Sequence, residues 1–390
     1  MAEPIEISHV GKTYPGGNQA LRDISINVDP GTFLVLLGPS GSGKTTLLRC
    51  VAGIEKVSAG TISIGGQLVA DGGRLHIPPD RRDLSMVFQD YALWPHLSAA
   101  DNVAFALRRR HLSRAECRAR AATMLDRVGL GALARRYPNE LSGGEQQRVA
   151  LARALIADTG LILCDEPLSN LDADLRERMR VEISTLVREA AATTVYITHD
   201  QAEAFALADQ VGVLEKGRLV QQGTPEEIYT EPATPFVARF TGLAGELPAR
   251  VKQRNADGTV LVEPDGGVPF LARSRPSASA SASASASAGT VTVLIRPTGV
   301  HLCPASPNGA SPNGADPNGA DPNGADPNGH HLTGRVTDVA FRGRGYEHAI
   351  DIDGRTRLTG VLAETRVPRG HPVSIRLDVA GCHAFPADLP

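Results

Sequence analysis

The chain has 390 residues, of which 42% are hydrophobic and 21% charged, and its formal net charge is −3. This length allows two or more domains, since one domain commonly has about 100–200 residues. No stretch of about 18 consecutive apolar residues occurs, which excludes a membrane-spanning helix. The nearly balanced charge gives no reason to expect a nucleic-acid partner.

The start of the chain and its cysteines indicate a cytoplasmic protein. Residues 1–6 contain no basic stretch followed by an apolar core, so they do not resemble an export signal. The five cysteines are scattered without the spacing of a metal site. Free thiols of this kind suit a reducing compartment.

The first strands lead to a glycine-rich loop. Alternating apolar residues over 5–7 and 21–28 predict half-exposed strands, whereas the continuous apolar run 33–37 predicts a central parallel strand. The sequence GPSGSGKT follows directly over 38–45, and a helical pattern begins at Thr46. A strand, a glycine-rich loop ending in Lys-Thr and a helix form the phosphate-loop pattern.

This pattern predicts a binding site for a polyphosphate. Glycines let successive backbone N–H groups face one point, and the following helix adds the positive end of its dipole there. Lys44 is expected to reach the β- and γ-phosphates, and the Thr45 hydroxyl to ligate Mg²⁺. The residues expected to bind the nucleotide here are Gly38, Ser40, Gly41, Ser42, Gly43, Lys44, Thr45 and Thr46. A kinase, a GTPase and a transport ATPase would all share this loop.

The rest of the first 242 residues reads as an α/β layer with a helical insert. Helical patterns fill about residues 98–156, and the layer resumes with a strand at 161–165, a helix at 173–191 and a strand at 194–198. Such alternation predicts a parallel sheet with ligands at the carboxyl ends of its strands. The alternating strands nearer the N-terminus form an antiparallel β subdomain in this interpretation.

Beyond residue 242 the pattern changes to short β segments, which predict a small β-barrel-like domain over 243–390. Two low-complexity stretches interrupt it, a Ser-Ala repeat over 277–288 and a Pro-Asn-Gly repeat within 304–331. Neither stretch carries apolar side chains for a core, so both are expected to form mobile loops.

Two acids end the apolar strand at 161–165. Successive residues on a strand point to opposite sides, so Asp165 and Glu166 cannot share one task. We assign Asp165 to the magnesium ion and Glu166 to the attacking water, as the general base or the group that orients the water. This strand with its two acids resembles the second nucleotide motif of phosphate-loop ATPases, and the resemblance implies ATP and Mg²⁺ as cofactors.

The stretch Leu141–Arg148, LSGGEQQR, decides which ATPase this is. Ser142, Gly143 and Gly144 open a helix and offer N–H groups to a second anion. Together with the phosphate loop and the acid-ended strand, this stretch resembles the signature sequence of the ATP-binding cassette (ABC) family. The resemblance implies a head-to-tail homodimer, in which the signature of one subunit covers the γ-phosphate that the other binds.

Further positions match the family in the expected order. The resemblance implies that Tyr14 stacks on adenine, that Gln89 contacts the metal and the water, and that His199 hydrogen-bonds the γ-phosphate. Asp172, in the Ser169–Asp172 segment, matches the loop that crosses the dimer interface. Glu145 and Trp94 depart from the common residues glutamine and phenylalanine, and neither change affects nucleotide chemistry.

The resemblance also implies a subclass. The insert is too short for the coiled coil of DNA-repair members, the chain holds one cassette where translation factors usually hold two, and no membrane helices are fused as in exporters. The stretch 88–97 and the trailing β domain resemble importer subunits with a TOBE-like domain. Such subunits lie at the cytoplasmic face of the inner membrane, bind two permease subunits there and serve a solute-binding protein indirectly.

The transported solute is not encoded in any motif. General likeness over residues 69–94 favours ferric iron, and a sugar, a polyamine or an oxyanion are alternatives. A second class of hypothesis is a cytosolic regulatory ABC ATPase without a transporter, whose β domain senses a metabolite.

Overall fold

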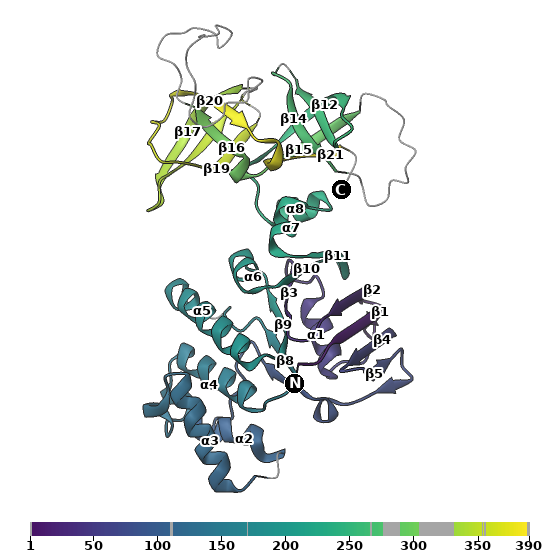
Figure 1. The fold of residues 1–390 in the computed structure, drawn as a ribbon, viewed down its shortest axis with the longest axis vertical. Helices are drawn as coiled ribbons and strands as arrows, with labels where there is room; N and C mark the ends of the chain where they lie inside the picture. The colour runs from purple at the N-terminus through teal and green to yellow at the C-terminus, as the bar shows by residue number, and fades with distance from the viewer. Residues whose placement is uncertain are drawn as a thin grey trace. The chain divides into compact units, whose positions relative to one another are not determined.

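The computed structural model describes residues 2–109, 112–169, 171–265, 267–275, 289–303, 331–352, 354 and 356–387. The predicted loops over 277–288 and 304–331 lie outside these residues, except for His331, which begins strand β17. The chain divides into two compact units, Met1–Glu227 and Ile228–Pro390, and Figure 1 shows the elements of each. Each unit is described by itself.

The first unit contains two sheets. A five-stranded antiparallel sheet has the order β2-β1-β4-β5-β6. Its strands are β1 Ile5–Thr13, β2 Gln19–Val28, β4 Ala59–Ile64, β5 Gln67–Asp71 and β6 Leu75–His76. A six-stranded sheet has the order β11-β10-β3-β9-β8-β7. Its strands are β3 Phe33–Leu37, β7 Leu84–Val87, β8 Leu161–Asp165, β9 Thr193–Thr198, β10 Gln210–Glu215 and β11 Arg218–Gly223.

The six-stranded sheet confirms the predicted parallel layer. Strand β3 lies between β9 and β10 and is parallel to both, and all five of its residues are buried. Strand β8 is parallel to β7 and β9 and is also buried throughout. Continuous apolar runs suit such strands because both of their faces are covered. The carboxyl ends of β3, β7, β8 and β9 therefore meet at one edge.

Helices surround this sheet and form the insert. They are α1 Lys44–Ala52, α2 Ala99–Phe105, α3 Arg114–Arg127, α4 Gly143–Ile156, α5 Ala173–Ala190 and α6 Gln201–Leu207. Helix α7, Pro225–Thr230, contains the boundary between the two units. Helices α2, α3 and α4 pack against one another and make up the insert. Helix α3 begins with a capping box, in which the Ser113 hydroxyl accepts from the Glu116 N–H at 3.2 Å and the Glu116 carboxylate accepts from the Ser113 N–H at 2.9 Å.

A buried arginine joins α1 to the antiparallel sheet. Arg82 is 4% exposed and donates to the carbonyls of Cys50 at 2.9 Å and Val51 at 2.5 Å, which end α1. It also donates to the Val69 carbonyl on β5 at 3.2 Å. Burial lowers the pKa of Arg82 to about 10. These bonds satisfy carbonyls that a helix end otherwise leaves open.

The second unit is mainly β structure. A closed barrel contains β12 Gly245–Arg254, β13 Thr259–Pro264, β14 Phe270–Ser274, β15 Thr290–Ile295 and β21 Cys382–Pro386. A five-stranded sheet of order β16-β20-β17-β18-β19 contains β16 Val300–Cys303, β17 His331–Phe341, β18 Tyr346–Asp351, β19 Arg357–Ala363 and β20 Pro372–Leu377. The unit also holds helix α8, Pro235–Phe240. The predicted β-barrel-like domain is confirmed, and a second sheet accompanies the barrel.

A second buried arginine organises this unit. Arg296, directly after β15, is 1% exposed and donates to the carbonyls of Tyr229 at 2.7 Å, Ala238 at 2.8 Å and Gly242 at 2.6 Å. Its guanidinium also lies 4.3 Å from the centre of the Tyr229 ring. Burial lowers its pKa to about 10. Arg296 thereby fixes the ends of α7 and α8 against the barrel.

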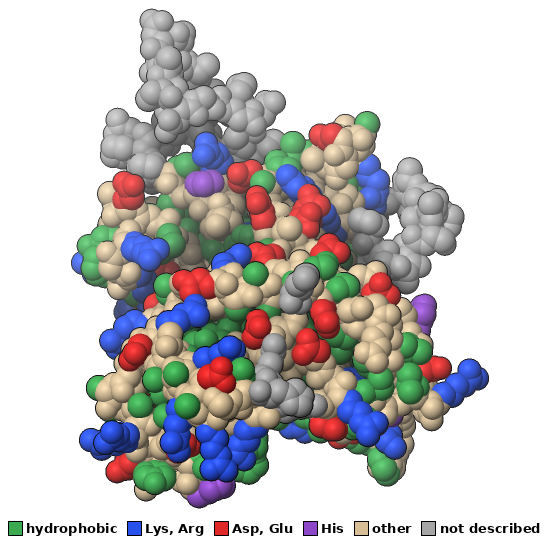
Figure 2. Space-filling view, turned by 60° about the horizontal axis from the view of Figure 1, so that its bottom comes forward, with side chains coloured by type: hydrophobic (Ala, Val, Ile, Leu, Met, Phe, Trp, Pro, Cys, Tyr) green, Lys and Arg blue, Asp and Glu red, His purple; other side chains and the backbone are tan. Residues whose placement is uncertain are grey.

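Among the described residues, no helix has both the length and the apolar character needed to cross a bilayer. Figure 2 shows acidic and basic side chains scattered together over the face that it presents, with apolar side chains between them.

Candidate nucleotide site

A cleft of about 610 Å³ lies at the carboxyl edge of the parallel sheet. The phosphate loop forms its base, and it brings together several predicted residues that are far apart in sequence. Those that line it are Tyr14, Ser40, Gly41, Ser42, Gly43, Lys44, Thr45, Thr46, Gln89 and Glu166. Sequence motifs did not single out Asn18, Arg22 or Lys216, which also line the cleft. No residue pattern around these three would have identified them.

Two positions of the loop require glycine because neighbouring backbone atoms lie too close for a side chain. A Cβ atom at Gly38 would lie 2.4 Å from the Leu214 carbonyl oxygen, and one at Gly43 would lie 2.7 Å from the Ala20 carbonyl oxygen. Gly43 also has φ +103°, which L-residues avoid. Any side chain at these positions would push the loop away from its neighbours.

The start of α1 is an open anion site. Gly43 occupies the N-cap position and supplies no side-chain cap, so the first N–H groups of the helix face the cleft. The Ser42 hydroxyl is buried and has no hydrogen-bond partner among the described residues. Unsatisfied donors next to a helix N-terminus suit a phosphate.

Lys44 folds back onto the loop. Its Nζ donates to the Gly38 carbonyl at 2.7 Å and the Pro39 carbonyl at 3.0 Å, and the residue is 4% exposed. Burial lowers its pKa, and the nearby Glu166 and Asp165 carboxylates act in the opposite direction. A buried ammonium that holds only neutral carbonyls is available to an anionic ligand.

Thr45 and Asp165 meet at the end of β8. The Thr45 hydroxyl donates to Asp165 Oδ1 at 3.3 Å. Asp165 is 4% exposed, and burial raises its pKa. Two hard oxygen donors beside a polyphosphate site are the ligands that Mg²⁺ prefers.

Glu166 lies just beyond strand β8, so strand alternation does not set the direction of its side chain as predicted. Strand β8 ends at Asp165, and Glu166 has φ +43°, in the left-handed region. This turn, rather than strand alternation, directs its carboxylate to His199, whose Nδ1 lies 3.2 Å from Glu166 Oε2. Both residues also line a cavity of about 20 Å³.

Tyr14 also lines the cleft and is half-buried. Its hydroxyl lies 3.4 Å from Thr46 Oγ1, and the Lys12 Nζ lies 4.8 Å from the centre of its ring. A flat ring beside a phosphate loop can stack on a base without reading its edges.

The signature residues do not line the cleft. Ser142 is exposed at the start of α4, where its hydroxyl donates to Glu145 Oε2 at 2.8 Å. Asp172 is exposed at the start of α5 and accepts from the Leu175 N–H at 3.0 Å. Gly143 and Gly144 follow Ser142 in α4. Within one chain these residues cap helices, and Ser142 and Asp172 present their side chains to the surface.

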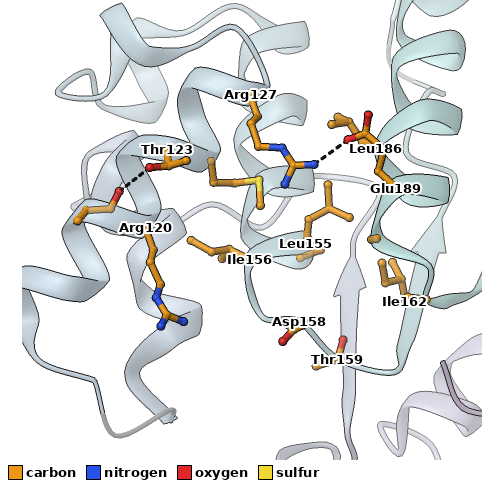
Figure 3. A pocket seen from close by; sticks show the side chains of 15 residues that line it. Arg120, Thr123, Arg127, Leu155, Ile156, Asp158, Thr159, Ile162, Leu186 and Glu189 are labelled. Carbon is orange, nitrogen blue, oxygen red and sulfur yellow. Dashed lines mark hydrogen bonds and ion pairs between the residues drawn. The ribbon is translucent and has the colours of Figure 1, made fainter. Parts of the chain in front are cut away.

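A second cavity, of about 530 Å³, lies between α3, the end of α4 and the end of α5. Figure 3 shows Arg127 on α3 pointing to Glu189 on α5, and the two side chains form an ion pair at 2.7 Å. Leu155, Ile156 and Leu186 line this cavity and are buried. The cavity contains none of the predicted site residues.

The site combines a lysine-bearing loop at a helix N-terminus with a threonine, an aspartate and a glutamate at one edge of the sheet. This combination defines a phosphate-loop ATPase. The comparisons specify it further. The ABC transporter model matches residues 21–169, and the TOBE domain model matches residues 293–385.

Known relatives are import subunits. An Fe(3+) ions import ATP-binding protein of Agrobacterium fabrum is 47% identical over 257 residues, which cover 66% of this chain and 71% of that protein. A spermidine/putrescine import ATP-binding protein of Thermobifida fusca is 45% identical over 273 residues, covering 69% and 70%. A trehalose/maltose import ATP-binding protein of Thermococcus litoralis is 50% identical over 239 residues, covering 61% and 64%.

A solved structure is also similar. The dimeric, post-hydrolysis ATP-binding cassette MJ0796, bound to ADP and Pi, matches with TM-score 0.51 and 32% identity, covering 57% of this chain and 98% of that chain. The chain belongs to the ABC transporter family. It is an ATP-binding ATPase subunit of the importer type with a TOBE domain, as predicted.

Proposed function

We propose that two copies of this chain enclose two ATP molecules head to tail and couple their binding and hydrolysis to solute uptake. The observation that carries this proposal is the convergence of the loop, Thr45 and Glu166 on one cleft, with the Asp165 carboxylate hydrogen-bonded to the Thr45 hydroxyl. Residues 1–242 act as the cassette and 243–390 as the TOBE-like domain in this scheme.

Within one copy, each group has a separate task. Lys44 and the loop N–H groups bind the phosphates, and Tyr14 holds the adenine. Glu166 accepts a proton from the attacking water or orients it. His199 lies within hydrogen-bond range of Glu166 and donates to the γ-phosphate when ATP occupies the cleft.

The donors present fit Mg²⁺. The Thr45 hydroxyl and the buried Asp165 carboxylate would hold the ion, with Gln89 nearby at the cleft wall. When bound, the ion neutralises charge on the phosphates. Thr45 and Asp165 are already hydrogen-bonded to each other, so little rearrangement is needed to present both oxygens.

The exposed helix starts suit the second copy. Ser142, Gly143 and Gly144 of one subunit would cover the γ-phosphate held by the other, and Asp172 would lie at the same interface. Their position outside the cleft of their own chain supports an action in trans.

Membrane partners have a candidate surface next to Gln89. Trp94 is 45% exposed and Phe105 37% exposed, with ring centres 5.6 Å apart. Exposed aromatic pairs of this kind favour protein contacts. We infer that two permease subunits bind here at the cytoplasmic face of the membrane, and that a solute-binding protein delivers the solute to them.

The solute proposed is ferric iron, with a sugar, a polyamine or an oxyanion as alternatives. The relatives are named for iron, polyamine and sugar import, so their names do not discriminate. A regulatory ATPase without a transporter is a further alternative. Copurification with two multi-span membrane proteins, followed by uptake assays with a panel of solutes, distinguishes these possibilities.

One variant pair tests the chemistry. Glu166→Gln should retain ATP binding and lower hydrolysis about 100- to 1,000-fold, because the general base is lost. Lys44→Ala should instead abolish binding of a labelled ATP analogue. Hydrolysis by Glu166→Gln at the wild-type rate would remove Glu166 from its role.

A further inference from the structure

Lys12 is a buried charge that none of the nucleotide motifs includes. The residue is 8% exposed, and its Nζ lies 4.8 Å from the centre of the Tyr14 ring. The same ammonium donates to Glu55 Oε2 at 2.8 Å and to the Lys56 carbonyl at 2.8 Å. Three contacts therefore fix the Lys12 side chain against one face of the Tyr14 ring.

These contacts connect two parts of the nucleotide site. Glu55 and Lys56 follow the end of α1, the helix that begins at Lys44 in the phosphate loop. Lys12 and Tyr14 belong to the antiparallel sheet, at and just beyond the end of β1. The ammonium thus ties the predicted adenine-binding ring to the helix that carries the phosphate-binding loop.

A β-bulge places Lys12 and Tyr14 on the same side. Ile5 and Ile7 are buried, so strict alternation would bury residues 9 and 11 and turn residue 12 outward. Instead the register shifts between Ile7 and Val10, and His9 has φ +51°. Bulges of this kind re-aim side chains next to functional sites. Val10, Gly11 and Lys12 are then all buried, and the register shifts again between Val10 and Lys12.

We propose that Lys12 is a positioning residue for nucleotide binding. It occupies one face of the Tyr14 ring and so reserves the other face for the base. This inference rests on the proposed role of Tyr14 in holding adenine. A cation over an aromatic ring is attracted to the electron-rich face, most strongly where water is excluded, as it is around this buried ammonium.

Two anchors then define the ring plane. The ammonium holds the ring from one side, and the contact between the Tyr14 hydroxyl and Thr46 Oγ1 holds its far end at 3.4 Å. A ring held in advance loses less conformational freedom when the base binds. Lys12 acts on the base only, because its contacts reach neither the loop carbonyls nor the Thr45 hydroxyl.

The test compares Lys12→Met with Lys12→Arg in the full chain. Loss of the cation should raise the KM for ATP about 3- to 10-fold, with kcat within about twofold of wild type. Lys12→Arg, which keeps a cation that stacks on aromatic rings, should restore most of the affinity. Calorimetry with tripolyphosphate, which has no base, should give the same Kd for Lys12→Met and wild type.

The variant Tyr14→Ala distinguishes the inference about Lys12 from the proposal that Tyr14 holds the adenine. If Tyr14→Ala leaves the KM for ATP unchanged, the proposed role of Tyr14 fails and that of Lys12 fails with it. If Tyr14→Ala weakens ATP binding and Lys12→Met does not, the inference alone is overturned. Equal weakening of ATP and tripolyphosphate by Lys12→Met would also overturn it. Should Lys12→Met fail to fold, Lys12→Gln, which removes the cation but keeps a polar end group for Glu55 and the Lys56 carbonyl, carries the same comparison.

Discussion

Each of the two units contains a buried arginine that donates hydrogen bonds to carbonyls at the ends of helices. The two arginines support different parts of the molecule. In the first unit, Arg82 holds the end of α1, the helix whose other end forms the phosphate site. In the second, Arg296 holds the ends of α7 and α8 against the barrel. Neither guanidinium contacts a carboxylate among the described residues. The same device thus supports a ligand site in one unit and a packing arrangement in the other.

The largest expected effect comes from removing these two charges. Arg82→Met and Arg296→Met should each lower the unfolding free energy of their own unit by about 3 to 5 kcal/mol, because several buried carbonyls lose their donors. Hydrogen exchange, read separately over residues 2–227 and 228–387, measures each loss. Only Arg82→Met should also weaken ATP binding, and an equal loss of affinity in Arg296→Met would erase the distinction.

Two buried groups, one in each unit, should respond to acidification in opposite directions. Burial, together with Arg275, Arg296 and Arg273, lowers the pKa of His383 from 6.5 to about 3. Below pH 6.5 the unfolded chain therefore binds a proton that the folded second unit does not. The unfolding free energy of this unit should fall by up to about 1.4 kcal/mol per pH unit between pH 6.5 and pH 3.

The first unit provides the contrast. Burial raises the pKa of Glu203 above its usual 4.5, so the stability linked to this group is present at low pH and is lost as pH rises through the raised pKa. Amide hydrogen-exchange rates, corrected for their intrinsic pH dependence, report the unfolding free energy of both units in one experiment. His383→Leu and Glu203→Gln should each flatten the response of one unit, and unchanged profiles would refute the assignments.

The smallest effects should come from exposed ion pairs. Arg127 pairs with Glu189 in the first unit, and Arg239 pairs with Glu246 at 2.8 Å in the second, with side chains about half exposed in all four residues. Arg127→Ala and Arg239→Ala should each change the unfolding free energy by less than about 1 kcal/mol, since solvent screens such pairs. Urea denaturation checks this, and a larger loss would mean that the arginine also contributes packing.

Much of the fold was predictable because local patterns determine it. Continuous apolar runs located β3 and β8, and the spacing of glycines, lysine and acids located the cleft. The signature stretch was predicted to start a helix and to cover the nucleotide of a second subunit, and Asp172 to lie in the loop at that interface. These positions near the nucleotide stay predictions, because a single chain does not bring the residues to its own cleft.

Other features depend on contacts between distant segments, which a sequence read locally does not reveal. Arg82 and Arg296 would be placed on the surface by composition, since arginine is rarely buried without a partner. The orientation of Lys12 depends on a bulge at His9, next to Gly60, where a Cβ atom would lie 2.3 Å from the His9 carbonyl oxygen. The position of the Glu166 carboxylate beside His199 follows from a left-handed residue beyond the end of β8 rather than from strand geometry.

The closure of the barrel constrains the order in which the chain can mature. Strand β21 pairs with both β14 and β15, although more than half of the second unit separates it from β15 along the chain. While a ribosome is still making that intervening segment, the edges of β14 and β15 that β21 will cover have no neighbour, and open edges invite pairing with other chains. The cassette, whose strands are all synthesised earlier, can complete its sheets during this interval, so slow translation after Ile295 would expose only the β domain to misassembly.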